Sequence, residues 1–107
     1  MTPEQTLHAR LAELDAEDAA GAEGQKTVEL DQQAVGRLSR MDALQNQAMA
    51  QAQARRREAE RTKIRAALAR LAEGEYGYCT ECGEEIAPAR LKADPAIALC
   101  AECMTAR

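Results

Sequence analysis

Leucines recur along the first twenty residues at the spacing of one helix face. They stand at positions i, i+4 and i+7, the period of an amphipathic helix: Leu7, Leu11 and Leu14. The stretch Thr2-Pro3-Glu4-Gln5 fits a capping box with proline at the first helical position. Gly21 follows the last alanines and is a typical helix stop. The pattern predicts a helix over 3–20 and a loop over 21–30.

A second, longer helical pattern follows. Asp31 fits the N-cap of this helix, and after it only Gly36 interrupts a run of good helix formers that continues to residue 72. Apolar residues mark one side of its first half and of its end: Val35, Leu38, Met41, Leu44, Ala48, Met49, and then Ile64, Ala67, Leu68, Leu71. Its middle has no large apolar residue, so one buried seam along the whole helix is not expected. We predict an antiparallel two-helix hairpin over 1–72, with helices at 3–20 and 31–72.

All four cysteines of the chain lie behind this hairpin, in two Cys-x-x-Cys pairs with seventeen residues between them: Cys79, Cys82, Cys100 and Cys103. This spacing is typical of a zinc site with four thiolate ligands. Because four protein ligands leave no open position on the metal, one structural Zn²⁺ is expected. A redox Cys-x-x-Cys of the thioredoxin type needs a surrounding βαβ pattern, and the sequence shows none.

The residues around the cysteines predict a small treble-clef-like finger over 73–107. Gly83 directly after the first pair permits the positive φ of a tight turn. The second pair runs into a stretch that favours a helix, and residues 88–93 favour one helical turn that ends before Asp94-Pro95. Four apolar residues are expected to form its core: Ile86, Leu91, Ile97 and Leu99. The fold class is therefore mainly α, a hairpin followed by a four-cysteine finger.

Charge is strongly segregated along the chain, although the formal net charge is only −4. Residues 1–31 hold eight acids and two bases, residues 32–72 nine bases and three acids, and residues 73–107 seven acids and three bases. An acidic segment folding back on a basic one, or a partner with charged surfaces, would explain such blocks. The sequence shows no signal peptide, membrane span, phosphate loop or Ser–His pair, so we expect a cytoplasmic protein without enzymatic activity.

The stretch GYCTECGEEI, the later RL, the proline two residues before Ile97 and the stretch LCAEC resemble the DksA/TraR family of bacterial regulators. The resemblance is specific over residues 73–103 and architectural over 31–72. It implies a transcription regulator that binds RNA polymerase, inserts its hairpin into the secondary channel, and does not bind specific DNA sequences or membranes. It also implies that the chain can act jointly with ppGpp.

Family members carry acidic residues at the hairpin tip in the pattern Asp-x-x-Asp-x-Ala. Asp31 matches the second aspartate, but Val28 stands three residues before it, where the first would be. Asp42 is the other acid in the tip half of the hairpin. The alternative for Asp31 is a helix cap, and for Asp42 an ordinary charge on a helix face.

A basic run with Arg55, Arg56 and Arg57 allows two interpretations. It can be a solvated helix face partly paired with Glu58 and Glu60, or a surface that contacts an acidic partner or nucleic-acid phosphates. Two further functions stay open beside polymerase binding: a nucleic-acid-binding zinc-finger module, which the acidic net charge disfavours, and a thiol redox sensor that releases zinc on oxidation.

Overall fold

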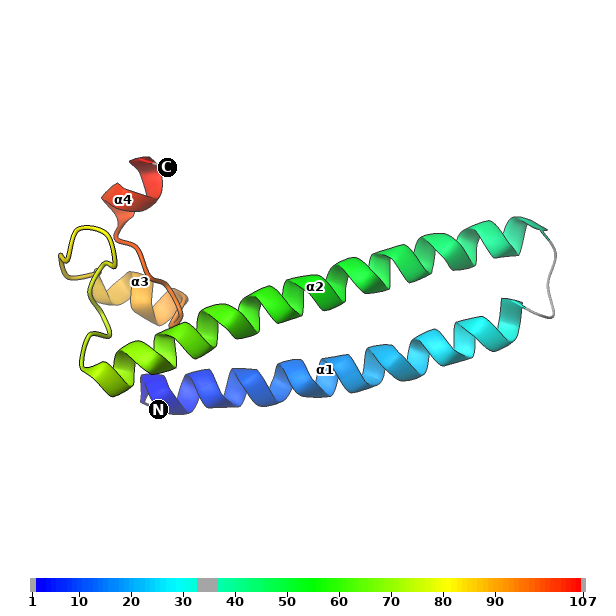
Figure 1. The fold of residues 1–107 in the computed structure, drawn as a ribbon, viewed down its shortest axis with the longest axis horizontal. Helices are drawn as coiled ribbons and strands as arrows, with labels where there is room; N and C mark the ends of the chain where they lie inside the picture. Colours follow the sequence, from blue (N-terminus) through cyan, green and yellow to red (C-terminus); the bar gives the residue numbers. More distant parts are fainter. Residues whose placement is uncertain (1, 33–36, 107) are drawn as a thin grey trace. The chain divides into compact units, whose positions relative to one another are not determined.

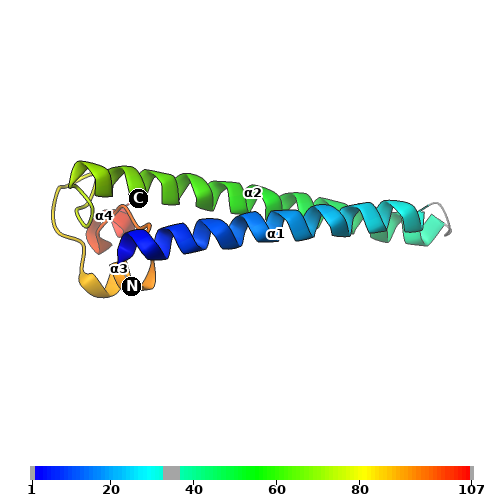
Figure 2. The same cartoon turned by 90° about the horizontal axis from the view of Figure 1, so that it is seen from below.

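The computed structural model describes the backbone of residues 2–32 and 37–106, and the side chains of 2–21 and 40–106. These residues form four helices, α1 (Pro3–Gln32), α2 (Arg37–Glu73), α3 (Pro88–Ala93) and α4 (Ala101–Ala106) (Figure 1). The chain groups into two compact units, Met1–Leu11 with Arg61–Arg107, and Ala12–Glu60. In each unit a stretch of α1 runs antiparallel beside a stretch of α2, as both views show (Figures 1 and 2).

The predicted fold class is confirmed, since a mainly helical chain forms an α1–α2 hairpin followed by a four-cysteine cluster. The division into a hairpin domain of residues 1–72 and a finger domain of residues 73–107 stays a prediction. Among the described residues, no helix is both long enough and apolar enough to cross a membrane.

The capping box fixes the start of α1. The backbone N–H of Gln5 donates to the Thr2 hydroxyl at 3.2 Å, and the backbone N–H of Thr2 donates to the Gln5 side-chain oxygen at 2.9 Å. Two N–H groups that the first helical turn leaves unpaired are thereby satisfied. The leucine stripe faces inward as predicted, since Leu7 and Leu14 are buried and Leu11 is half-buried.

The predicted loop at 21–30 is wrong, because α1 continues through Gln32. Asp31 consequently lies in the last turn of α1 and does not cap the second helix, which begins at Arg37 and not at residue 31. Residues 33–36, which include the predicted apolar Val35, lie outside the described residues.

The surroundings of Gly21 are consistent with a glycine inside α1. It lies opposite Arg57 of α2, and a Cβ placed on it would stand 3.5 Å from the Arg57 Nη2 atom. The guanidinium of Arg57 is held here by an ion pair with the Asp18 carboxylate, one turn earlier in α1. A glycine inside a helix costs about 1 kcal/mol relative to alanine, and contacts with a neighbouring helix can outweigh that propensity.

Candidate metal centre

The first cysteine pair lies in a tight knuckle. The backbone N–H of Cys79 donates to the Glu84 carbonyl at 2.8 Å, and that of Gly83 donates to the Cys79 carbonyl at 3.0 Å. Gly83 has a φ of 77°, a conformation that costs little only for a residue without Cβ. Tyr78 and Glu85 form an antiparallel bridge that closes the knuckle. The local sequence thus turns both cysteines of the pair towards the same side.

The second pair lies at the start of α4. Cys100 directly precedes this helix, and its carbonyl accepts the backbone N–H of Met104 at 3.0 Å. Cys103 lies one turn further on, inside α4. A knuckle followed by a pair that opens a helix is the arrangement predicted for a treble-clef-like finger.

The four sulfur atoms gather at one point. All four lie within 4.8 Å of one another, and the sulfurs of Cys82 and Cys100 are 3.6 Å apart. Four sulfurs held about 2.3 Å from one Zn²⁺ in a tetrahedron lie about 3.8 Å from one another. A disulfide needs about 2.05 Å, and the four cysteines are free. The donor set and its spacing therefore fit a tetrahedral zinc site.

A small apolar core supports the cluster. Cys79, Ile86 and Leu99 are buried together, and Leu91 and Ile97 pack against them half-buried. The four apolar residues predicted for this core are thus all found in it. The helical turn over Pro88–Ala93 also forms as predicted, and it ends at Asp94.

Comparison with known proteins identifies the finger. Residues 74–107 match the family model described as the prokaryotic dksA/traR C4-type zinc finger. By this match, residues 74–107 form a zinc finger of the DksA/TraR type. The RNA polymerase-binding transcription factor DksA of Haemophilus influenzae is 49% identical over 43 residues, which cover 40% of this chain and 30% of that protein. The match therefore spans about a third of the length of this curated relative.

The likeness to a solved structure extends beyond the finger. The structure of transcription factor DksA2 from Pseudomonas aeruginosa superposes with a TM-score of 0.84 at 26% identity, over 97% of this chain and 78% of that one. One structural zinc ion is the cofactor of the DksA/TraR finger, as predicted. The curated relative is a transcription factor, which agrees with the prediction that the chain is not an enzyme.

The thiols of the DksA/TraR finger differ in acidity. Backbone N–H groups of Cys82 and then Cys100 donate to the Cys79 sulfur and lower the pKa of Cys79 from 9.0 to about 6. The neighbouring sulfurs, that of Cys100 first, raise the pKa of Cys103. The Cys79 thiolate therefore forms readily, whereas the neighbouring cysteine sulfurs oppose deprotonation of Cys103. A dication supplies the charge that lets all four thiolates coexist.

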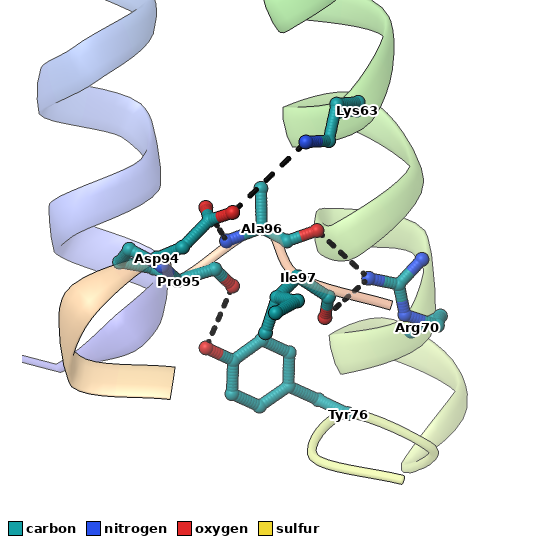
Figure 3. A network of polar contacts seen from close by, with 7 residues as sticks. All are labelled: Lys63, Arg70, Tyr76, Asp94, Pro95, Ala96 and Ile97. Atoms are coloured by element: carbon teal, nitrogen blue, oxygen red, sulfur yellow. Dashed lines mark hydrogen bonds and ion pairs between the residues drawn. The ribbon is translucent and has the colours of Figure 1, made fainter. Parts of the chain in front are cut away.

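The loop between the cysteine pairs is held to the end of α2 by a polar network (Figure 3). The Tyr76 hydroxyl donates to the Pro95 carbonyl at 2.8 Å. The Arg70 guanidinium donates to the carbonyls of Ala96 and Ile97, each at 3.5 Å. Three successive carbonyls of the finger thus accept donors from the end of α2 or from the segment that leaves it.

Asp94 completes this network. Its carboxylate accepts the backbone N–H of Ala96 at 3.2 Å and lies 3.9 Å from the Lys63 Nζ atom on α2. Arg70, Tyr76 and Asp94 were not predicted from the sequence as site residues. The only signal was Asp94-Pro95, which is typical of a turn, and nothing in the sequence indicated which donors would meet its carbonyls.

The structure places the other predicted site residues on the hairpin. Asp42, Arg55 and Arg56 are exposed on α2. Arg57 is 17% exposed, and its charge is paired with that of Asp18 within the hairpin. Asp31 belongs to α1, and its side chain lies outside the described ones.

Proposed function

We propose that the chain is a transcription regulator that binds RNA polymerase, with its hairpin inserted into the secondary channel and its zinc finger as the structural base. The observation that carries this proposal is the likeness to DksA2 over 97% of the chain, together with the DksA/TraR finger. The curated relative is by its printed name an RNA polymerase-binding factor, and its match lies in the finger region alone. Polymerase binding by this chain is an inference from both findings.

An element that enters a pore must be thin, and the unit of residues 12–60 is a helix pair. It is two helices wide, and α2 with 37 residues is about 55 Å long. The ion pair between Asp18 and Arg57 fixes the register of the two helices against each other. A hairpin held in one register can present its tip at a fixed depth.

The proposed role of the four cysteines is to hold the zinc ion that fixes this base. The ligands would be Cys79, Cys82, Cys100 and Cys103. With four protein ligands the ion has no position for substrate or water, so its role is structural. The loop between the cysteine pairs is bonded to the end of α2, so a finger ordered by zinc also fixes that end of the hairpin.

If the hairpin enters the channel, its acidic and basic residues would contact different parts of the polymerase. Asp31, in the last turn of α1, and the exposed Asp42, near the start of α2, would act inside the channel. Arg55 and Arg56 are exposed further along α2 and would contact acidic groups of the polymerase outside it. A joint effect with ppGpp and a cytoplasmic location belong to the same proposal.

Equilibrium binding to core RNA polymerase tests the proposal. The decisive variant lacks residues 24–51 and joins the two ends with a short Gly/Ser linker. Residue 23 lies five positions after Asp18, and residue 52 lies five positions before Arg57. Both helices are therefore cut at the same distance from this ion pair and keep their register. We expect the intact, zinc-loaded chain to bind and the shortened chain to lose at least tenfold in affinity.

The matched control replaces Asp31 and Asp42 by asparagine and leaves the length unchanged. This variant should still bind but should lose its effect on transcription, because only the charge at the tip is removed. Equal affinity of the intact and shortened chains, with zinc present in both, would remove the insertion model.

Nucleic-acid binding by the finger is the less favoured alternative. The described part of the finger exposes several carboxylates near the cysteine pairs: Glu81, Glu84, Glu85 and Glu102. Such a surface repels phosphates, whereas nucleic-acid binders present clustered lysine and arginine. Salt-sensitive binding of the chain to plain duplex DNA, without affinity for polymerase, would favour this alternative.

A further inference from the structure

The outward face of α2 carries apolar residues with no cover in the described structure. Met41, Leu44 and Met49 are 60%, 60% and 62% exposed. At about 100° of rotation per residue, these side chains fall within about 140° of the helix circumference. Ala43 and Arg57, which face α1, lie on the opposite side of α2. We call the residues of this outward face the outer stripe; Ala52 is half-buried and the others are exposed: Met41, Asp42, Leu44, Ala48, Met49, Ala52, Arg55 and Arg56.

Two charges of the outer stripe are placed symmetrically about one of its apolar residues, Met49. Asp42, Met49 and Arg56 follow one another at intervals of seven residues, and all three are exposed. Seven residues are about two helical turns, so the three side chains lie on one line along α2, about 10.5 Å apart. An acid, an apolar residue and a base are therefore equally spaced, with the apolar residue at the centre.

We propose that the outer stripe is the interface of an antiparallel homodimer with its two-fold axis at Met49. A two-fold axis there sets the two Met49 side chains against each other. It also sets Asp42 of each copy against Arg56 of the second copy. An isologous contact requires such a self-complementary surface.

The same register also brings a long side chain close to Leu44. Leu44 of one copy comes to the level of residue 54 of the second, one position from Arg55, whose aliphatic stem can reach over it while the guanidinium stays in water. Ala48 and Ala52, close to the axis, are small and let the two helices approach. A partner of a different sequence would need an independent match to this order of charges, whereas a second copy supplies it by symmetry.

The size of the stripe sets the strength of this dimer. One face of one helix buries less than the roughly 1,000 Å² that stable interfaces need. The dimer is therefore weak and forms at high chain concentration. Because its two ion pairs are at the surface, it should weaken further in high salt.

Sedimentation of the zinc-loaded chain without polymerase, with D42R and R56D as variants, tests the dimer. For the unmodified chain the mean mass should rise from monomer towards dimer as concentration increases. Each variant alone should stay monomeric, because it sets like charges against each other at both contacts. An equimolar mixture of the two should regain the dimer, because in the mixed pair both contacts join opposite charges.

Glu17→Arg on α1 is the matched control, since it makes the same change of charge at an exposed site outside the stripe. It should dimerise as the unmodified chain does, and circular dichroism should show equal helix content in all variants. An unmodified chain that stays monomeric throughout, single variants that dimerise as well as it does, or a mixture that stays monomeric would each overturn the proposal.

The dimer has a regulatory consequence that rests on the proposed function. A hairpin paired along α2 is too wide for the channel that a single hairpin enters, so dimer and polymerase would compete for the chain. The two claims fail separately. Sedimentation without polymerase decides the dimer, and binding of the shortened chain to polymerase decides the insertion.

Discussion

Among the single residues, Tyr76 ties the finger loop to the segment that follows α2. Its hydroxyl donates to the Pro95 carbonyl at 2.8 Å (Figure 3). We expect Tyr76→Phe to lower the free energy of unfolding of the zinc-loaded chain by about 1 kcal/mol, the usual net value of one hydrogen bond. Tyr78→Phe is the control, because Tyr78 is exposed. Denaturant unfolding measures both, and equal stability of the two variants would contradict the role given to Tyr76.

Tyr76 also predicts a pH dependence. Burial raises the pKa of Tyr76 above its ordinary value of 10.0; Arg70 acts against this rise and Asp94 adds to it. Folding thus favours the neutral phenol, so its contribution to stability is complete below pH 10 and is lost as the pH rises through the raised pKa. The chain has two tyrosines and no tryptophan, so absorbance of Tyr78→Phe follows Tyr76 alone. A midpoint at or below pH 10 would contradict the burial.

Gly83 determines the shape of the zinc knuckle through its backbone. Its φ is 77°, and a Cβ added there would meet no atom within 4 Å. Gly83→Ala therefore tests backbone strain without a steric clash, at a cost of about 1–2 kcal/mol. We expect zinc affinity, measured by competition with a chelator, to fall about tenfold. Gly83→Asn should lose less, because asparagine tolerates this conformation better, and an alanine variant with unchanged affinity would contradict the account.

At the level of whole elements, the length of α1 is the feature that differs most from the prediction. If Gly21 lies inside a helix, Gly21→Ala should stabilise the chain by about 0.5–1 kcal/mol, because alanine is the better helix former. The added Cβ reaches only ordinary contact distance from Arg57. The exposed Ala20→Gly is the opposite control and should destabilise by a similar amount. Thermal unfolding measures both, and a destabilising Gly21→Ala would argue for a helix end at residue 20.

The elements that the sequence predicted well depend on local chemistry. Thr2 and Gln5 cap α1 through neighbours three residues apart, and the two cysteine pairs form turns from their own spacing. Past Gly21, α1 continues instead at a place where it lies beside Arg57, a neighbour that only the folded hairpin brings near. Arg70 likewise donates to carbonyls 26 and 27 positions away. Such contacts leave no periodic signal in a sequence, so the network of Figure 3 could not be predicted.

For the molecule as a whole, the account makes zinc the condition for an ordered finger. The apolar core of the finger has few members, Cys79 and Leu99 among them, and so small a core rarely stabilises a fold without a metal or another covalent support. The hairpin unit of residues 12–60 contains none of the four cysteines and has its own buried residues, Leu14 and Ala43. Removal of zinc should therefore unfold the finger and leave the helices of that unit in place.

Amide hydrogen exchange, recorded together with the zinc content of the purified chain, tests this claim most directly. We predict one zinc ion per chain, protected amides between residues 77 and 104, and loss of that protection alone when a strong chelator removes the ion. A chain without stoichiometric zinc, or one whose finger stays protected after the zinc is gone, would contradict the account.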